Sequence, residues 1–368
     1  MARQVKKLNV AMIGSGFMGR AHSNAFLQAG RFFDTPYGLR LKVVCARRRG
    51  AVEDFAANWG WEEPQTEWQS VVARKDVDIV DICAPNHMHA PIAVAAAEAG
   101  KMVLCEKPLA INLAEAERMA EAARRVPNLV WFNYRRVPAI ALARQLVGQG
   151  TIGKPFHYRA TYLQSWGGDP AVANAWRFRQ AEAGSGAMGD LLAHSLDLAL
   201  LLNGPVTEVS SLLQTFVPER EVDDAVLTLA RFANGSVGSL EATRFATGCL
   251  NRNYFEIHGS HGAIRFNLED MNRLEVFAST DPPQIQGFRN LLVTSPEHPY
   301  AGHFWPPGHI LGYEHTFILT VVDFLESVAR GDVFHANFDD AVEVQKVLDA
   351  VQRSSGSKSW MNVGASRG

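Results

Sequence analysis

Short apolar runs alternate with longer amphipathic segments through the first third of the chain. Nearly continuous runs rich in Val, Ile and Leu are typical of parallel strands buried on both faces. They occupy residues 8–13, 41–45, 78–83, 101–104 and 129–132. The segments between them are long enough for crossover helices, so residues 1–132 are predicted to form a Rossmann-type α/β domain with a doubly wound parallel sheet.

The pattern changes after Pro155, where shorter strand-like runs are separated by Gly or Asn turns. These runs cover residues 156–164, 208–216, 223–232, 236–243, 253–259 and 263–267. Asn234-Gly235 is a strong hairpin signal, and residues 258–262 form a second tight reversal. Residues 133–368 are therefore predicted to form an α+β domain with a large, mostly antiparallel sheet, helices on one face, and a last helix able to pack back on the first domain.

Bulk composition supports two soluble domains and narrows the choice of partners. The chain has 368 residues, of which 47% are hydrophobic and 20% charged. A net charge of −2 gives no electrostatic basis for binding nucleic acid or an acidic membrane. The first strand begins at once, which leaves no room for a signal peptide, so we expect a cytoplasmic protein.

The cysteine pattern predicts free thiols and no metal site. Cys45, Cys83, Cys105 and Cys249 include no Cys-x-x-Cys pair, and no Cys/His cluster has ligand spacing. Such thiols stay reduced in the cytosol.

A glycine-rich turn follows the first predicted strand and precedes a helix. Its residues are Gly14, Ser15, Gly16, Phe17, Met18 and Gly19. The first glycine allows the tight turn, the second lets the backbone approach a pyrophosphate, and the third lets the helix pack on the strand. This context predicts a dinucleotide cofactor.

The end of the second predicted strand bears on the choice between NAD and NADP. An acidic residue commonly stands there in NAD sites, but this chain has Ala46, Arg47 and Arg48. Arginines can pair with a 2′-phosphate, which favours NADP slightly, although an Arg can also stack on adenine and leave NAD in use.

Two further strand ends supply polar groups to the same edge of the sheet. Ala84, Pro85, Asn86 and His89 follow the strand at 78–83, and Glu106, Lys107 and Pro108 follow the strand at 101–104. Open α/β sheets bind ligands at the carboxyl ends of their strands, so both segments are expected to face the cofactor.

A predicted helix at residues 187–202 carries polar groups among leucines. Asp190, His194 and Asp197 are spaced four and three apart, so they share one helical face. An internal hydrogen-bond network is one explanation, since burying unpaired polar groups costs about 1–3 kcal/mol each. The other is an active-site face with His194 as proton shuttle.

Together these motifs resemble the Gfo/Idh/MocA oxidoreductases, and the resemblance covers essentially the whole chain. It rests on the glycine turn, on Ala84 to His89, on Glu106-Lys107-Pro108 and on the helix with Asp190 and His194. The resemblance implies catalytic roles for Lys107, Asp190 and His194, and an NAD(P)-dependent reaction at a secondary alcohol or hemiacetal carbon of a sugar, glycoside or inositol. The segment 298–317 looks like that of branches acting on sugars or inositols.

Further substrate contacts are expected around those three residues. Candidates are Tyr134, Arg135, Trp176, His309 and His315, while Trp166 and Trp305 offer flat faces that core packing explains equally well.

The expected chemistry is hydride transfer from a sugar C–H to the nicotinamide. His194 would take the hydroxyl proton, Lys107 would stabilise charge on the same oxygen, and either could be the primary base. The alternatives are a glucoside 3-dehydrogenase, an NAD-dependent glycosidase of the same fold, and a non-catalytic sugar-sensing regulator. An exposed sheet face in the second domain would make the protein a homodimer or homotetramer.

Overall fold

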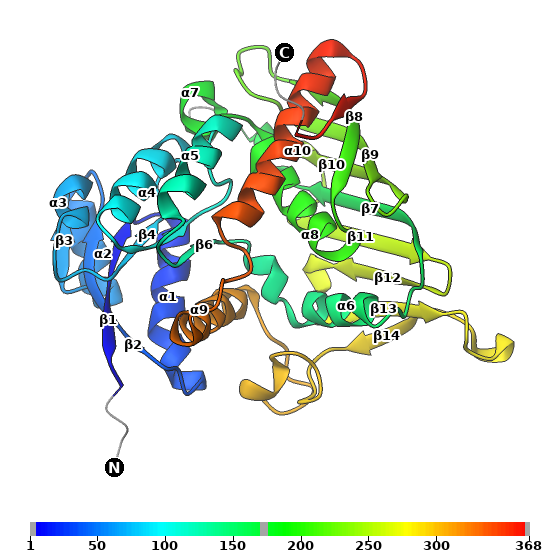
Figure 1. The fold of residues 1–368 in the computed structure, drawn as a ribbon, viewed down its shortest axis with the longest axis horizontal. Coiled ribbons are helices and arrows are strands. Elements are labelled where there is room, and N and C mark those ends of the chain that lie inside the picture. Colours follow the sequence, from blue (N-terminus) through cyan, green and yellow to red (C-terminus); the bar gives the residue numbers. More distant parts are fainter. Residues whose placement is uncertain (1–4, 170–175, 365–368) are drawn as a thin grey trace. The chain divides into compact units, whose positions relative to one another are not determined.

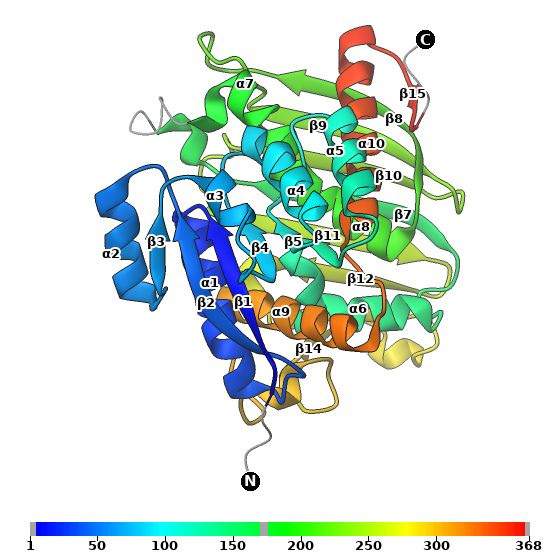
Figure 2. The ribbon, with the colours of Figure 1, turned by 60° about the vertical axis from the view of Figure 1, so that its left-hand side comes forward.

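The computed structural model describes residues 5–169 and 176–364, and the chain forms two compact units (Figure 1). The first unit contains residues up to Asn133 together with Gly312–Val342, and the second contains Tyr134–Leu311 and the residues after Val342. The sequence division at residue 133 placed the whole remainder in the second domain. Residues 312–342 differ from that expectation because α9 (Tyr313–Arg330) packs its apolar face against α1 (Phe17–Phe32) (Figure 2).

A six-stranded parallel sheet forms the core of the first unit, in the order β3-β2-β1-β4-β5-β6. Its strands are β1 (Lys7–Ile13), β2 (Gly38–Cys45), β3 (Glu63–Gln65), β4 (Ile79–Ile82), β5 (Met102–Cys105) and β6 (Asn128–Val130). The five apolar runs all form strands of this sheet, so the predicted doubly wound fold is confirmed. Strand β3 was missed because its sequence, Glu-Pro-Gln, carries no apolar signal.

Helices cover both faces of this sheet. Besides α1 and α9 they are α2 (Arg49–Trp59), α3 (Trp68–Val72), α4 (His89–Glu98) and α5 (Leu113–Ala123). Helix α4 packs on α5, and this pair lies on the opposite side of the sheet from α1 and α9 (Figures 1 and 2). Parallel strands with right-handed crossovers require this two-sided cover, and it leaves the carboxyl ends of the strands for loops.

The second unit is built on a nine-stranded sheet in the order β14-β13-β12-β11-β7-β10-β9-β8-β15. Its strands are β7 (Pro155–Leu163), β8 (Val206–Gln214), β9 (Ala225–Phe232), β10 (Val237–Thr243), β11 (Arg252–Gly259), β12 (Gly262–Asn267), β13 (Arg273–Ala278), β14 (Arg289–Leu292) and β15 (Met361–Asn362). Strands β7 and β10 pair in parallel, and the other neighbours in this sheet are antiparallel. The predicted mostly antiparallel sheet is thus confirmed, including the Asn234-Gly235 hairpin between β9 and β10.

Helices of the second unit pack on one face of this sheet. Helix α6 (Pro138–Gly148) contacts β12 and β13, and α8 (Ala193–Asn203) contacts β7 and β11. The last helix, α10 (Phe338–Ser357), begins in the first unit and continues into the second. There its Ser354 hydroxyl accepts a hydrogen bond from the backbone of Ser211 in β8.

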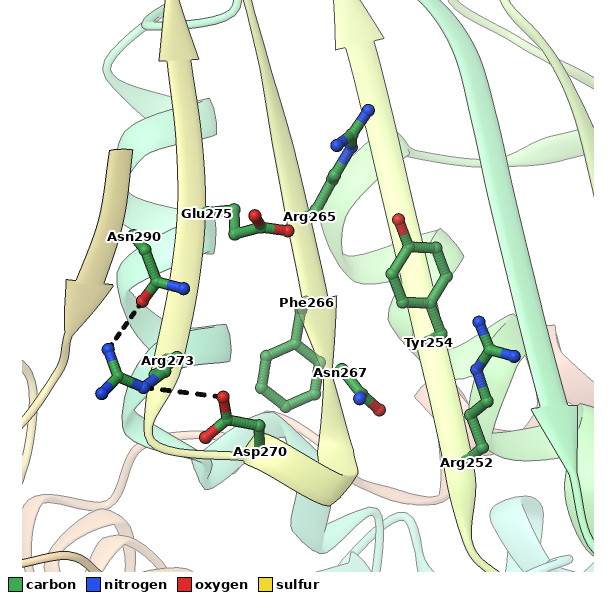
Figure 3. A pocket seen from close by; sticks show the side chains of 9 residues that line it. All are labelled: Arg252, Tyr254, Arg265, Phe266, Asn267, Asp270, Arg273, Glu275 and Asn290. Atoms are coloured by element: carbon green, nitrogen blue, oxygen red, sulfur yellow. Dashed lines mark hydrogen bonds and ion pairs between the residues drawn. The ribbon is translucent and has the colours of Figure 1, made fainter. Parts of the chain in front are cut away.

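The opposite face of the large sheet carries exposed side chains. Over β11 to β14 this face is polar and holds a pocket of about 310 Å³ (Figure 3). Its lining includes Arg252, Tyr254, Arg265, Arg273 and Glu275. Over β8 and β9 the same face is apolar, because Leu212 pairs with Leu227 across the strands and both are exposed.

Candidate active site

The turn after β1 has the geometry of a dinucleotide cradle. Gly14 has φ of +117°, and a Cβ there would lie 2.5 Å from the carbonyl oxygen of Cys83. A Cβ on Gly19 would lie 2.7 Å from the Gly14 oxygen. A Cβ on Gly16 would meet nothing within 4 Å, so the backbone at the start of α1 borders open space. Unpaired amides at a helix N-terminus favour a phosphate at that place.

Of the other cradle residues at this helix end, Phe17 is exposed, and Ser15 and Met18 are half-buried. Phe17 is 59% exposed, and its ring stacks on Tyr313 at 6.1 Å between centroids. Ser15 and Met18 lie in the same turn. At the end of β2, Ala46 is half-buried while Arg47 and Arg48 are exposed. The groups expected to distinguish NAD from NADP are therefore accessible.

The two loops at the ends of β4 and β5 are tied together by one histidine. His89 is buried, with Nδ1 3.0 Å from the Pro108 carbonyl oxygen and Nε2 3.0 Å from the Ala84 oxygen. Pro85 and the buried Asn86 lie in the turn that His89 supports. His89 was expected to face the cofactor. In the structure, both of its ring nitrogens contact backbone carbonyl oxygens of these loops.

Lys107 follows β5 and is held through the residue before it. Glu106 is buried, and its Oε2 accepts a hydrogen bond of 3.1 Å from the Lys107 amide. Its Oε1 lies 3.0 Å from Nε2 of His22. The Lys107-Pro108 peptide is cis. Glu106 was expected to bind the cofactor, but both of its carboxylate oxygens have partners within the protein.

His22 stands at the centre of a buried charge cluster. Its Nδ1 lies 2.9 Å from Asp81, and its ring stacks on Trp131 at 3.9 Å. Burial by itself lowers the pKa of His22, but the charges and hydrogen bonds of Asp81 and Glu106 outweigh it and raise the pKa from 6.5 to about 9. At neutral pH His22 is therefore an imidazolium between two carboxylates.

The same cluster is the one place in the described ranges where three potential metal ligands lie close together. Atoms of His22, Asp81 and Cys83 fall within 4.8 Å of one another. Hydrogen bonding explains this grouping, and an imidazolium that donates through both nitrogens has no lone pair left for a metal.

Asp190 occupies an unusual helical turn in the second unit. The predicted helix at 187–202 begins as a π-helix, Met188–Leu192, which continues into α8. The buried carboxylate of Asp223 accepts hydrogen bonds of 2.7 Å from the amides of Gly186 and Met188. A Cβ on Gly186 would overlap the Asp223 backbone at 1.7 Å, so only glycine fits there. π-Turns are frequent at functional sites.

Arg244 fixes the Asp190 carboxylate. Its Nη2 donates to Asp190 Oδ2 at 2.9 Å, and the Arg244 side chain is 1% exposed against 22% for Asp190. The guanidinium also lies 4.9 Å from the Trp166 ring. Cation–π contact compensates part of its desolvation. Asp190 therefore presents an anchored carboxylate at the surface of the second unit.

His194 lies beside a line of hydrogen-bonding side chains. Its ring centroid is 4.5 Å from that of Tyr134. The Tyr134 hydroxyl is 2.9 Å from that of Tyr162, which donates to Asn251 at 2.8 Å. The structure thus brings Tyr134 and His194 together, as the sequence predicted for substrate contacts.

Arg135 and Asp197 form a buried ion pair next to this line. Arg135 Nη2 lies 2.6 Å from Asp197 Oδ1, and both side chains are buried. Arg135 was expected to contact substrate and Asp197 to share the face of His194. This pair neutralises both charges within the second unit.

The other three residues expected to contact substrate, Trp176, His309 and His315, lie in different environments. Trp176 is half-buried, with the Arg177 guanidinium 4.6 Å from its ring. His309 is exposed, and its Nδ1 is 3.0 Å from the Pro306 oxygen. His315 belongs to the first unit, where its Nδ1 accepts the Gly312 amide at the start of α9. Burial lowers the pKa of His315, which suits this acceptor role.

Several residues that hold the site had no signal in the sequence. His22, Asp81, Asp223 and Arg244 are each far in sequence from the residue they support. Tyr162 and Asn251 fall in a strand and a loop without any motif. Only the position of Arg244 directly after a predicted strand could have drawn attention to it.

Comparisons with known proteins match both units to one family. The model of the oxidoreductase family with an NAD-binding Rossmann fold matches residues 8–134, and the model of the GFO/IDH/MocA C-terminal domain matches residues 140–265. Levoglucosan dehydrogenase of Pseudarthrobacter phenanthrenivorans is 40% identical over 98% of this chain and 99% of its own. Myo-inositol 2-dehydrogenase of Thermotoga maritima is 28% identical over 77% and 81%.

Solved structures agree with this relationship. Levoglucosan dehydrogenase in complex with NADH has a TM-score of 0.96 at 41% identity, covering 98% of this chain and all of that one. An oxidoreductase domain protein from Kribbella flavida has a TM-score of 0.95 at 48% identity, over 98% of this chain and all of its own. The chain belongs to the Gfo/Idh/MocA family of oxidoreductases. It is an NAD-binding enzyme of the sugar and inositol dehydrogenase class.

None of the helices in the described residues is long and apolar enough to cross a membrane.

We expect Asp197→Ala to destabilise the protein by about 3–5 kcal/mol, because the mostly enclosed guanidinium of Arg135 would lose its carboxylate partner. The double variant Arg135→Met/Asp197→Leu should recover most of this loss, since it removes both charges. Urea denaturation followed by circular dichroism measures the difference. A single variant within about 1 kcal/mol of wild type would contradict a buried pair.

Stability should also depend on the protonation of His22. Its folded-state pKa of about 9 exceeds the ordinary 6.5, so its contribution is complete below pH 6.5 and is lost as the pH rises through 9. The shift corresponds to about 3 kcal/mol. Unfolding free energies measured from pH 6 to 10 should fall more steeply in wild type than in His22→Gln. Equal slopes in the two proteins would refute the charged state.

Proposed function

We propose that this enzyme oxidises a secondary alcohol on an intact sugar, with levoglucosan as the first substrate to test. The observation that carries the proposal is the end-to-end match to levoglucosan dehydrogenase. The second unit supports it chemically, because Asp190, His194 and Tyr134 offer hydrogen-bonding groups of the kind that recognise a polyhydroxylated ring. A substrate rich in hydroxyls needs several such fixed partners.

In this proposal two side chains handle the proton and the oxygen of the reacting alcohol, and a third holds the sugar ring. His194 takes the hydroxyl proton as general base, and Lys107 donates a hydrogen bond to the same oxygen as negative charge develops. Asp190, anchored by Arg244, accepts a hydrogen bond from a neighbouring hydroxyl and fixes the ring. Bound nicotinamide supplies the hydride acceptor, and the turn from Gly14 to Gly19 would hold its pyrophosphate.

The dehydrogenase proposal predicts large losses from two substitutions. Lys107→Ala and His194→Ala should each lower kcat by at least about 100-fold and leave the Kd for NADH within about 3-fold of wild type. Absorbance of the reduced cofactor measures turnover with levoglucosan, inositols and glucosides. Lys75→Ala, at an exposed position, is the control and should retain full activity. Near-normal turnover in both test variants would overturn the assignment of roles.

The same substrate panel distinguishes the alternative reactions. A glucoside 3-dehydrogenase would reduce the cofactor only with glycosides and leave the glycosidic bond in place. An NAD-dependent glycosidase would release free sugar without net reduction of the cofactor. A sugar-sensing regulator would bind sugar and reduce no cofactor with any member of the panel.

NAD is the cofactor supported for the family, and we propose that this chain can also use NADP. Ala46 carries no charge to repel a 2′-phosphate, and exposed Arg47 can pair with it. We expect Arg47→Asp to lower kcat/KM for NADP by about 10-fold or more while changing that for NAD by less than about 3-fold. Steady-state kinetics with both cofactors provide the measurement. Wild-type enzyme without any NADP turnover would contradict the proposal.

We further propose that the protein is a homodimer or homotetramer that associates through the apolar part of the open sheet face. Leu212, Leu227 and Leu229 are 57%, 48% and 55% exposed and lie on adjacent strands. Burying such a patch against a second copy removes apolar area from water.

Sedimentation velocity tests the association. Leu227→Glu combined with Leu229→Glu should convert the oligomer to monomer, because a buried interface does not accommodate unpaired carboxylates. Val333→Glu, also at an exposed apolar position, should leave the assembly unchanged. An unaltered sedimentation coefficient in the double variant would exclude this face as the interface between copies.

The cytoplasmic location expected from the sequence stays a prediction.

A further inference from the structure

The Glu-Lys-Pro turn is connected to α1 by a chain of short polar contacts. His22 Nε2 lies 3.0 Å from Glu106 Oε1, and Glu106 Oε2 accepts the Lys107 amide at 3.1 Å. One carboxylate thus bridges a fixed histidine and the backbone of the proposed catalytic lysine.

His22 is itself immobilised from every side. Its Nδ1 lies 2.9 Å from Asp81 in β4 and 3.0 Å from the Cys83 sulfur. Trp131 stacks on the ring at 3.9 Å and donates to Asp81 at 2.9 Å. Phe317 of α9 closes the remaining side at 5.4 Å. The groups facing His22 are therefore two carboxylates, one thiol and two aromatic rings, and the side chains of His22 and Asp81 are fully buried.

The cluster around His22 contains one more carboxylate than the charge of the histidine requires. Burying one carboxylate beside a histidine would satisfy the charge of His22, but the cluster uses two. Asp81 holds the ring in place, and Glu106 transmits that position to the Lys107 backbone. A displacement of Glu106 would move the start of the turn, because its second oxygen has the Lys107 amide as partner.

We propose that His22 is a positioning residue for Lys107: it clamps Glu106 so that the Glu-Lys-Pro turn holds the lysine in its productive place at the end of β5. This inference rests on the proposed function in taking Lys107 as catalytic. His22 contacts neither substrate nor cofactor in this role, and it acts through Glu106 alone. Loss of the clamp should therefore affect turnover more than binding.

The experiment compares variants that break contacts inside and outside the cluster in the full-length enzyme. His22→Gln and Glu106→Gln weaken the clamp. Trp61→Phe is the matched control, since it removes a buried hydrogen bond of 3.0 Å to Ser23 of α1 and leaves every contact of His22 given above in place. For each we would measure the melting temperature, kcat, KM, the Kd for NADH, and the rate at which Lys107 reacts with acetic anhydride across pH, followed by mass spectrometry.

We expect the two clamp variants to lower kcat by about 10–100-fold, with KM and the NADH Kd within about 3-fold of wild type. The rate profile of Lys107 labelling should shift by about 3-fold or more in rate, because the turn would no longer hold the amine in one position. Trp61→Phe should lower the melting temperature but keep kcat and the labelling profile. If all three variants lose only stability, His22 is structural and the proposal is overturned.

Labelling separates this inference from the proposed function. If wild-type enzyme turns over no sugar, the dehydrogenase proposal fails, but a shifted Lys107 profile in the clamp variants still supports positioning. An unshifted profile in both contradicts it. Should His22→Gln fail to fold, Glu106→Gln decides the outcome, because it keeps nearly the same shape while removing the charge.

Discussion

A buried imidazolium between two carboxylates is the interaction on which the carboxyl-terminal edge of the parallel sheet depends. Asp81 is fully buried at the end of β4, and Glu106 is buried at the end of β5. Without a cation between them, two carboxylates in an apolar interior would repel each other and lose solvation. His22 supplies the charge, and its contacts connect the carboxyl ends of both strands. The His89 tie and the Lys107 turn lie in the loops that follow these strands, and the glycine turn follows the neighbouring strand β1.

In the second unit, arginine side chains neutralise the carboxylates near His194. Arg244 holds Asp190, and Arg135 holds Asp197. The Asp190 carboxylate is 22% exposed, whereas that of Asp197 is 2% exposed. Asp190 is therefore the more accessible of the two carboxylates. Burying any of these charged side chains alone would cost free energy. As pairs, they fix the orientation of the polar groups around His194.

The sequence predicted the parts of this structure that depend on local pattern. Continuous apolar runs marked the strands of the parallel sheet, Asn234-Gly235 marked a hairpin, and the glycine turn marked the cradle. It did not predict contacts between distant residues, such as Arg244 with Asp190 or His22 with Asp81. It missed β3, whose three residues have no apolar periodicity, and the π-turn at Asp190, where Asp223 binds the first amides of the helix. Arg135 and Glu106 were expected to bind ligands, and only the structure reveals that each has a partner within the protein.

The central claim is that this enzyme removes a hydride from a ring carbon of an intact sugar. The most direct measurement uses levoglucosan deuterated at its ring carbons, with the reduced cofactor examined by NMR. We expect one deuterium per molecule of reduced cofactor and a ketosugar product with its anhydro bridge intact. Free glucose without reduced cofactor, or reduced cofactor without deuterium, would contradict it.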